Sequence, residues 1–249
     1  MTNKEKQNFT ALDEYLRKVG NIFFRWRSYI PLLLIPLLIL KLHDFQRTFT
    51  NQYIEIIYQA LCLVISFTGE LVRILTIGFV PSGTSGRNTK AQRATTLNTT
   101  GMYSVTRNPL YLGNYLMILG ISLFSRSWEI VFINSIFFLI FYVPIILTEE
   151  NFLLGKFGNT FSEYALKAPC FFPRFRLWTS SENRWSWGMV VRREYSSIFS
   201  LALSFVFVAH LRLYVISKEI TYSEAWLVFG GVFLLIWVIV RILRLLKKL

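Results

Sequence analysis

The chain has 249 residues, of which 53% are hydrophobic and 17% aromatic, and its 27 Lys and Arg outnumber its 14 Asp and Glu for a formal net charge of +13. One soluble core of this size cannot hide so much apolar side chain, so a soluble globular domain is excluded and a bilayer is expected to cover the rest. A nucleic-acid-binding module is excluded because the basic residues alternate with long apolar runs, and an anionic membrane surface explains the charge better.

The amino-terminal residues and the two cysteines give little sign of processing or of metal chemistry. Residues 1–20 are polar, and no small-residue cleavage site follows the first apolar run, so we predict no cleavable signal peptide. Cys62 lies inside an apolar run and Cys170 lies beside Pro169, in a spacing that fits neither a metal site nor a disulfide framework. Both cysteines are predicted to be structural, and no bound metal is expected.

Six apolar runs approach the length of about 20 residues that a helix needs to cross a bilayer. In chain order they cover residues 28–42, 53–77, 110–124, 128–147, 198–216 and 225–246. Pro31 and Pro36 interrupt the first run, and only Ser125-Arg126-Ser127 separates the third run from the fourth. We therefore predict an all-α integral membrane protein with about six membrane helices, of which the third and fourth form a tight hairpin.

The distribution of Lys and Arg predicts the orientation of these helices, because basic residues accumulate in cytoplasmic loops. The amino terminus, residues 81–107, residues 148–197 and the carboxyl-terminal tail are all rich in Lys and Arg, whereas the connections near Asp44, Ser125 and Glu219 carry few. Both termini and the two long polar segments are therefore predicted to be cytoplasmic, and an active site built from those segments would face the cytoplasm.

Polar residues lead directly into the third apolar run. The stretch 81–88 is rich in Gly, Ser and Thr and can offer backbone N–H groups to an anion, although a flexible loop is its simpler interpretation. Pro109 suits the first turn of a helix, whose free N–H groups and positive dipole end would point at the preceding loop, and Gly113 would leave room for a ligand. This pattern favours a site for an adenosine or phosphate group.

The fourth run closes on Glu149 and Glu150, and two carboxylates at a membrane boundary are costly without partners. Arg107 is the expected partner, whereas a solvated helix end is the alternative interpretation. Farther along, residues 157–164, followed by Pro169 and Pro173, predict a short amphipathic helix on the membrane surface that ends before the prolines.

Together these motifs resemble a known superfamily. Gly101-x-Tyr103, Arg107-Asn108-Pro109-x-Tyr111-x-Gly113, Glu149-Glu150, and Phe157-Gly158 with Tyr164 and Pro169 are similar to motifs of the isoprenylcysteine carboxyl methyltransferase and phospholipid methyltransferase superfamily, over about residues 83–173. The resemblance implies that S-adenosylmethionine binds between the Arg-x-Pro helix start and the acidic pair. It also implies that a membrane lipid or lipidated substrate enters sideways from the bilayer.

Carried over position by position, the resemblance implies a set of cofactor-binding residues from the polar segment, the helix start and the acidic pair. They are Thr95, Thr96, Leu97, Asn98, Tyr103, Asn108, Pro109, Leu110, Tyr111, Glu149 and Glu150. Arg107 is a candidate catalytic residue. Arg192 and Arg193 are candidates as well, because a guanidinium group binds phosphate or carboxylate in a bidentate manner, although anchoring the next membrane helix is an alternative role for them.

The resemblance also implies three regions. Residues 1–80 form an amino-terminal region with two membrane helices. Residues 81–178 form the methyltransferase core, with the cofactor loop, the hairpin, the acidic pair and the amphipathic helix. Residues 179–249 form a carboxyl-terminal extension with two further helices, in which His210 and Arg212 are polar residues without an assigned role.

Two departures from the family pattern bear on the substrate. Asn108 stands where the family usually has His, which keeps a hydrogen-bonding side chain but removes a titratable group. Ile145 and Ile146 stand where carboxyl-methylating members carry an Arg that engages the substrate carboxylate. This second departure favours a phosphate-bearing lipid over an isoprenylcysteine as the methyl acceptor.

Methyl transfer to a carboxylate or phosphate oxygen needs no strong general base, because the acceptor is already ionised at pH 7, and positioning is expected to dominate catalysis. An alternative is an NADPH-dependent membrane sterol or steroid reductase, since such enzymes have a similar pattern. A transporter or membrane scaffold is a third hypothesis, but no inverted repeat is apparent in the sequence to support transport. The oligomeric state is left open.

Overall fold

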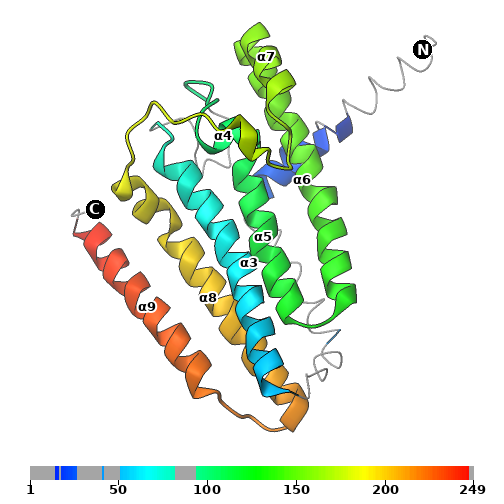
Figure 1. Cartoon of the computed structure of the whole chain (residues 1–249), viewed down its shortest axis with the longest axis vertical. Helices are drawn as coiled ribbons and strands as arrows, with labels where there is room; N and C mark the ends of the chain where they lie inside the picture. Colours follow the sequence, from blue (N-terminus) through cyan, green and yellow to red (C-terminus); the bar gives the residue numbers. More distant parts are fainter. Residues whose placement is uncertain (1–14, 17, 27–40, 42–50, 82–93, 247–249) are drawn as a thin grey trace, which may run out of the picture.

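The computed structural model describes residues 15–16, 18–26, 41, 51–81 and 94–246, and all regular secondary structure in these ranges is helical. Figure 1 shows the helices from residue 51 onward as a bundle of long rods. The labelled elements are α3 (Gln52–Gly78), α4 (Met102–Val105), α5 (Pro109–Phe124), α6 (Trp128–Phe157), α7 (Asn159–Lys167), the 3-10 helix η3 (Phe175–Leu177), α8 (Trp187–Ser217) and α9 (Glu224–Leu245). The predicted all-α membrane architecture is confirmed.

Among the described residues, four helices are long and apolar enough to cross a membrane, namely α3, α6, α8 and α9. They contain the predicted runs 53–77, 128–147 and 198–216 and nearly all of 225–246. The predicted run 110–124 forms α5, whose 16 residues span only about 24 Å, less than the hydrocarbon core of a typical bilayer. The predicted first run, 28–42, lies outside the described residues except for Lys41.

The predicted hairpin between the third and fourth runs is confirmed, since α5 ends at Phe124 and α6 begins at Trp128. The Ser127 side chain caps α6 by accepting a hydrogen bond from the Ile130 amide. Arg126, in the turn, forms an ion pair with Glu55 of α3, and Arg212 of α8 lies 3.5 Å from the same carboxylate. Arg212 therefore has a structural role, in which it ties α8 to α3 at the hairpin end.

Two predicted helix boundaries were wrong. Helix α6 continues to Phe157 rather than ending near Leu147, because no helix-breaking conformation occurs before Gly158, whose φ of 53° turns the chain into α7. Glu149 and Glu150 therefore lie inside the helix. Helix α8 begins at Trp187 rather than at residue 198, because the Ser186 side chain accepts the Met189 amide and caps it there. The predicted amphipathic helix is α7.

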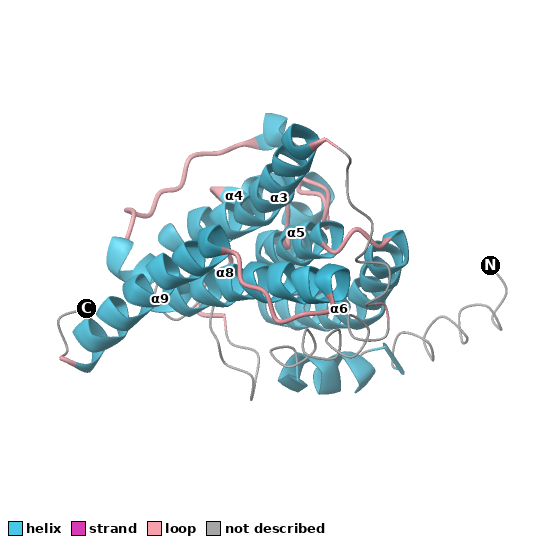
Figure 2. Ribbon diagram, turned by 90° about the horizontal axis from the view of Figure 1, so that it is seen from below, coloured by secondary structure: helices cyan, strands magenta, loops and turns pink. Residues whose placement is uncertain are grey.

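The helices lie side by side in the order α6, α5, α3, α8, α9 across the bundle, as the views from the side and from below agree (Figures 1 and 2). Packing is closest between α3 and α5, where the Ser66 hydroxyl donates to the Met117 carbonyl. Helix α9 contributes no buried residue and packs on α8 through rings such as Trp226 against Phe205. Its exposed apolar side chains are what a lipid-facing helix requires.

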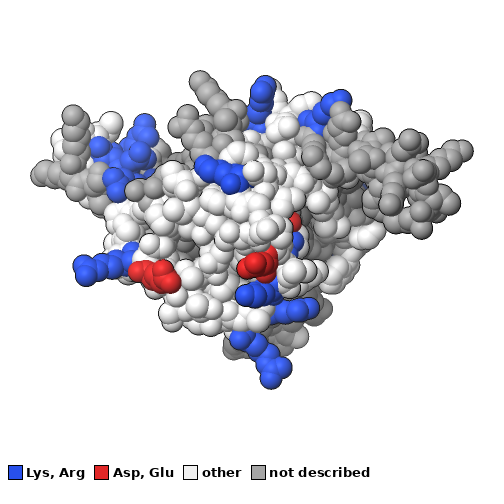
Figure 3. Space-filling view, turned by 90° about the horizontal axis from the view of Figure 1, so that it is seen from above, with Lys and Arg blue, Asp and Glu red and all other residues white. Residues whose placement is uncertain are grey.

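One end of the bundle carries the polar connections that were predicted to hold the site. Here α3 ends, α5 and α8 begin, and the segment between α7 and α8 crosses the bundle (Figure 1). We call it the upper end. Seen from above, basic side chains are spread over this face and acidic side chains are fewer (Figure 3). The charge of this face suits the predicted cytoplasmic side of a membrane.

Candidate functional site

An ion pair between Arg107 and Glu150 forms the centre of the candidate site. Arg107 Nε and Nη2 each donate to one carboxylate oxygen of Glu150, at 2.9 Å in both cases. The side chains are 15% and 18% exposed, so the pair is partly shielded but still reachable from water. The pair joins Arg107, which lies just before the start of α5, to the upper part of α6. The predicted proximity of Arg107 to the acidic pair is thus observed at Glu150.

Asn108 completes this centre on the side of α5. Its Nδ2 donates to Glu150 Oε1 at 3.1 Å and to the Cys170 carbonyl at 3.0 Å, so the side chain turns to the carboxylate and does not cap its own helix. Pro109 occupies the first turn of α5 and is buried. The Cys170 thiol lies 3.6 Å from Glu150 Oε1. An amide, a carboxylate, a guanidinium and a thiol therefore meet at one point.

The last turn of α7 and the residues that follow it form the second wall of the site. Arg107 Nη1 donates to the carbonyls of Ala165 and Ala168, at 2.8 and 2.7 Å, and its backbone amide donates to Pro169 at 2.9 Å. The Tyr164 hydroxyl donates to the Tyr103 carbonyl at 2.8 Å. These hydrogen bonds fix the residues before α5 to the segment that leaves α7.

Burial and the charge of Glu150 together influence the protonation of the groups at this centre. Burial acts to lower the pKa of Arg107, but the hydrogen bonds and the charge of Glu150 outweigh it, so the pKa is raised and the guanidinium stays charged. Burial and then the charge of Glu150 raise the pKa of the Cys170 thiol, and burial raises the pKa of Tyr164. The thiol and the phenol are therefore held neutral, and neither is prepared to act as a base or nucleophile at pH 7.

An aromatic floor lies below the polar centre. The Tyr111 ring is buried on α5 and meets the Tyr142 ring of α6 edge to face, with 5.3 Å between their centroids. Tyr142 in turn stacks on Phe138 at 4.2 Å. Leu110, the neighbour of Tyr111, is half-buried. The predicted residues of the α5 start thus separate a polar layer above from an apolar layer below.

The remaining predicted cofactor residues, Thr95 to Asn98, lie before α4. Thr95 and Thr96 are exposed and Leu97 and Asn98 half-buried, in an irregular stretch that starts beside α6, where Lys156 donates to the Ala94 carbonyl. Of the stretch 81–88, the structure describes only Pro81.

Glu149 and Glu150 do not act as one pair. Adjacent residues of a helix point about 100° apart, so Glu149 is directed to a different face of α6 from Glu150. Glu149 is half-buried there, whereas Glu150 meets Arg107 and Asn108.

Arg192 and Arg193 lie within α8 rather than in a loop before it. The Arg192 side chain is exposed, and its Nε donates to the Gly188 carbonyl one turn earlier in the same helix, at 3.0 Å. Arg193 is half-buried on the same turn. The observed Arg192 hydrogen bond therefore keeps that side chain on α8 and does not join it to the Arg107–Glu150 pair.

Gly113 serves helix packing, which corrects the prediction that it leaves room for a ligand. A Cβ atom at this position would lie 2.6 Å from the Arg73 side chain and 2.6 Å from the Gly69 carbonyl oxygen. Gly113 thus faces α3, not the polar centre. The missing side chain allows α5 to approach α3 closely.

A second Arg–Glu centre lies deeper in the bundle and was missed by the sequence analysis. Arg73 of α3 binds both carboxylate oxygens of Glu194 of α8, at 2.8 to 3.0 Å, and donates to Asn114 Oδ1 of α5 at 2.6 Å. Glu70 and Glu194 are each only 1% exposed, and Ser197 donates to Glu70 at 2.8 Å. The available signal was the presence of Glu70 and Arg73, three residues apart, inside an apolar run.

Comparison with known proteins places the Arg107 centre within a recognised family region. The family model for phospholipid methyltransferases matches residues 55–160, from α3 into α7. The protein-S-isoprenylcysteine O-methyltransferase of Schizosaccharomyces pombe is 26% identical over 129 residues, which are 51% of this chain and 54% of that protein.

Two bacterial relatives are more similar over shorter segments. A cobalt-zinc-cadmium resistance protein of Cupriavidus metallidurans is 40% identical over 91 residues, 36% of this chain and 41% of the relative. A nickel-cobalt-cadmium resistance protein of Alcaligenes xylosoxydans xylosoxydans is 33% identical over 117 residues, 44% of this chain and 54% of the relative. The chain thus spans about half the length of the curated relatives it matches. No solved structure matches the chain significantly.

Proposed function

We propose that the chain, which matches the phospholipid methyltransferase family model over residues 55–160 and is similar to an isoprenylcysteine O-methyltransferase, is a membrane methyltransferase that uses S-adenosylmethionine. The proposed acceptor is a carboxylate or phosphate oxygen of a membrane-embedded lipid or isoprenylcysteine-like substrate. The observation that carries the proposal is the meeting of Arg107, Asn108 and Glu150 at the start of α5, inside the region that the family model covers.

The residues at this centre suit the chemistry of the proposed donor. S-adenosylmethionine carries a sulfonium, an ammonium, a carboxylate and ribose hydroxyls, so its site needs both acceptors and donors. Glu150 supplies carboxylate oxygens that are partly exposed, although the chain as a whole is strongly basic. Arg107 and Asn108 hold this carboxylate in place through the N–H groups that they donate to it. Glu149, Tyr103, Tyr111 and the stretch 95–98 are the further residues proposed to hold the donor.

The protein's own contribution to catalysis would be positioning and exclusion of water. When bound, S-adenosylmethionine supplies an electrophilic methyl group on its sulfonium. Glu150 would hold and orient the cationic part of the donor, while the carbonyls of Ala165 and Ala168 keep the Arg107 guanidinium in place. The Tyr111 and Tyr142 rings would close the site on its apolar side. Such positioning can supply several kcal/mol of barrier reduction, as an order of magnitude.

The proposed acceptor is an oxygen anion because the centre offers no base for deprotonating a neutral nucleophile. The Cys170 thiol and the Tyr164 phenol both have raised pKa values, and Glu150 is already engaged by Arg107. A phosphate or carboxylate is ionised at pH 7 and needs no such base. Ile145 and Ile146, both buried in α6 below Glu149, leave no guanidinium at that point for a carboxylate substrate, which favours phosphate.

A radiolabelled methyl donor tests the proposal directly. The purified protein, in vesicles made from total membrane lipid, is incubated with methyl-labelled S-adenosylmethionine, and the lipid extract is separated. We expect label as a methyl ester of an acidic lipid, with incorporation by Glu150→Gln protein reduced about 10- to 100-fold. Label found on an amine headgroup would overturn the oxygen acceptor, and no incorporation together with NADPH oxidation would favour the reductase alternative instead.

A further inference from the structure

The segment that follows the site wall carries an exposed aromatic and basic surface that methyl transfer does not use. We define residues 171–178, Phe-Phe-Pro-Arg-Phe-Arg-Leu-Trp, as the basic-aromatic segment. Phe172, Phe175 and Trp178 are 80%, 68% and 47% exposed. Arg174 and Arg176 are exposed between them, and no acidic residue lies between Glu163 and Glu182. We propose that this segment docks onto the surface of an anionic bilayer, with its arginines on acidic headgroups and its aromatic rings below them.

The depth of the segment supports a bilayer surface as the occupant. Helix α5 begins just after Arg107 and spans about 24 Å from there to the hairpin turn, whereas the hydrocarbon core is about 30 Å thick. With the hairpin turn at the opposite boundary, the start of α5 cannot stand clear of the bilayer. The basic-aromatic segment is bonded to this level, because Arg174 donates its backbone amide to Val105 at 2.9 Å and Thr106 donates to the Phe171 carbonyl at 3.0 Å.

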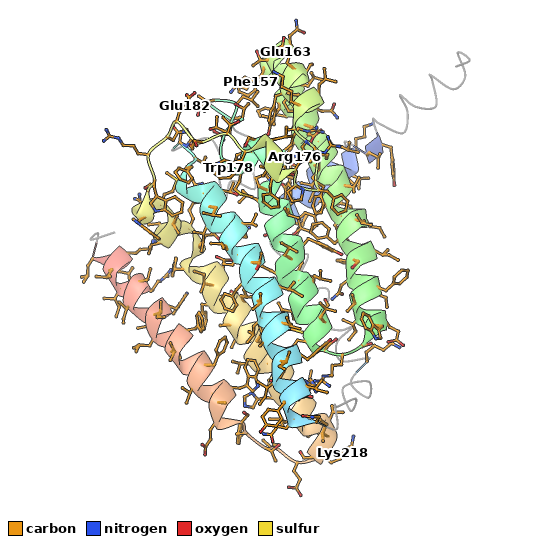
Figure 4. All side chains as sticks on the ribbon, viewed as in Figure 1. Phe157, Glu163, Arg176, Trp178, Glu182 and Lys218 are labelled. Carbon is orange, nitrogen blue, oxygen red and sulfur yellow. The ribbon has the colours of Figure 1, made fainter. Side chains whose placement is uncertain are left out.

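One residue anchors the segment to the bundle, and the exposed rings and guanidinium groups that follow it suit an interfacial element. Phe171 turns inward, with its ring 6.0 Å from Phe138 and 6.2 Å from Tyr115, and Phe172 turns outward. Figure 4 shows Arg176 and Trp178 at the upper end, near the level where α3 ends, with Lys218 at the opposite end. Aromatic rings and guanidinium groups are the side chains that favour the headgroup boundary, where one part is apolar and the other polar.

Charge complementarity selects an anionic bilayer over a neutral one. Arg174 and Arg176 have no carboxylate partner among the described residues, so their charge is available to lipid phosphates. Each basic residue close to an anionic membrane surface strengthens attachment about fivefold. The segment is positively charged, as is the chain as a whole.

The test measures how deeply the segment enters lipid in the full-length protein. A single cysteine is placed by Phe172→Cys in a Cys62→Ala, Cys170→Ser background, labelled with an environment-sensitive fluorophore and reconstituted in nanodiscs. Phosphatidylcholine discs are compared with discs that also contain phosphatidylglycerol, each with acyl-brominated lipid as the quencher. Glu182→Cys, an exposed site beyond the segment, is the matched control.

We expect lipid quenching at position 172 to be stronger in the anionic discs and to fall as salt is added. Arg174→Gln and Arg176→Gln should each reduce the difference in quenching between anionic and neutral discs about fivefold. The matched charge control, Arg184→Gln, should leave it unchanged. Equal quenching in neutral and anionic discs would overturn the proposal. So would a label that stays accessible to aqueous iodide in both, which is the outcome for a surface that faces water or a protein partner.

Discussion

Two Arg–Glu pairs lie one above the other in the upper half of the bundle and differ in what surrounds them. Arg107 and Glu150 are both partly exposed, at 15% and 18%, and their other partners are the Asn108 amide and the carbonyls of Ala165 and Ala168 at the end of α7. In the deeper pair, the Arg73 side chain is also 17% exposed, but the side chain of its carboxylate partner Glu194 is only 2% exposed. Arg73 reaches across three helices, from α3 to Glu194 of α8 and to Asn114 of α5. The two pairs use the same chemical groups at different depths.

The difference indicates separate roles. The deeper centre holds two carboxylates, Glu70 and Glu194, against one guanidinium, and one oxygen of Glu70 has no hydrogen-bond partner in the described part of the chain. Buried charges of this kind are strongly destabilising once a partner is removed. The upper centre can exchange partners with water or a ligand at lower cost, because it is not sealed. We therefore expect mutations in the deeper pair to change folding and mutations in the upper pair to change binding.

The largest effect is expected for Arg73→Met. This change leaves Glu70 and Glu194 without their cation in a low-dielectric environment and should lower the free energy of unfolding by about 3–5 kcal/mol. Thermal unfolding of the purified protein in detergent measures it. The matched control is Arg192→Met on the exposed face of α8, which should unfold at the wild-type temperature.

A second variant keeps this prediction interpretable if Arg73→Met protein does not fold. Adding Glu194→Gln replaces the carboxylate that Arg73 binds directly with a neutral side chain and should recover part of the lost stability. An unfolding temperature that is unchanged in Arg73→Met protein would contradict a structural role for the deeper pair.

The upper pair should respond in the opposite way. Glu150→Gln keeps a hydrogen-bonding side chain but removes the charge, so we expect kcat/KM for the methyl donor to fall about 10- to 100-fold, with little change in the unfolding temperature. The control is Glu163→Gln on α7, whose carboxylate is exposed. A loss of stability as large as that of Arg73→Met, with activity retained, would remove the distinction between the two pairs.

Alkylation of Cys170 reports on the charge of Glu150 without requiring activity. In a Cys62→Ala background, the raised pKa of Cys170 means less thiolate at a given pH, so its alkylation should be slower than that of an ordinary thiol. The alkylation rate should keep increasing at pH values above those at which an ordinary thiol is already ionised. Glu150→Gln removes a negative neighbour, lowers the pKa and should accelerate the reaction several-fold at pH 8. S-adenosylhomocysteine should protect the wild-type thiol. An alkylation rate that is identical in the two proteins would show that the Glu150 charge does not reach Cys170.

The smallest effect is expected for Asn108→Ala. The side chain donates one hydrogen bond to Glu150 and one to the Cys170 carbonyl, and it has no cap to lose. Removing it should cost about 1 kcal/mol of stability and weaken donor binding a few-fold. Fluorescence titration with S-adenosylhomocysteine measures the affinity. A loss larger than that of Glu150→Gln would mean that Asn108, not the carboxylate, dominates the site.

The sequence predicted the parts of this arrangement that depend on local pattern. The hairpin at Ser125-Arg126-Ser127, the helix start at Pro109 and the proximity of Arg107 to the acidic pair follow from apolar runs, proline and the cost of unpaired charge near a membrane. Which carboxylate Arg107 binds depended on whether α6 includes Glu149 and Glu150, because adjacent residues of a helix point about 100° apart. Gly158 ends that helix only through its positive φ.

The rest depended on contacts between residues far apart in the chain. Arg73 and Glu194 are 121 positions apart, and neither apolar run by itself shows that the two faces meet. From the sequence, Gly113 was predicted to leave room for a ligand, whereas α3 approaches closely and fills the space beside it. Because the Ser186 side chain caps α8, the helix begins earlier than predicted and includes Arg192 and Arg193. Packing, not propensity, decided these cases.

Calorimetric titration of the wild-type protein in detergent tests the central claim most directly. S-adenosylhomocysteine and NADPH are added in separate experiments, because the two cofactors distinguish methyl transfer from the reductase alternative. We expect saturable binding of S-adenosylhomocysteine at one site per chain, weakened about 10- to 100-fold in Glu150→Gln protein, and no binding of NADPH. Binding of NADPH alone, or binding of S-adenosylhomocysteine that is indifferent to Glu150, would contradict it.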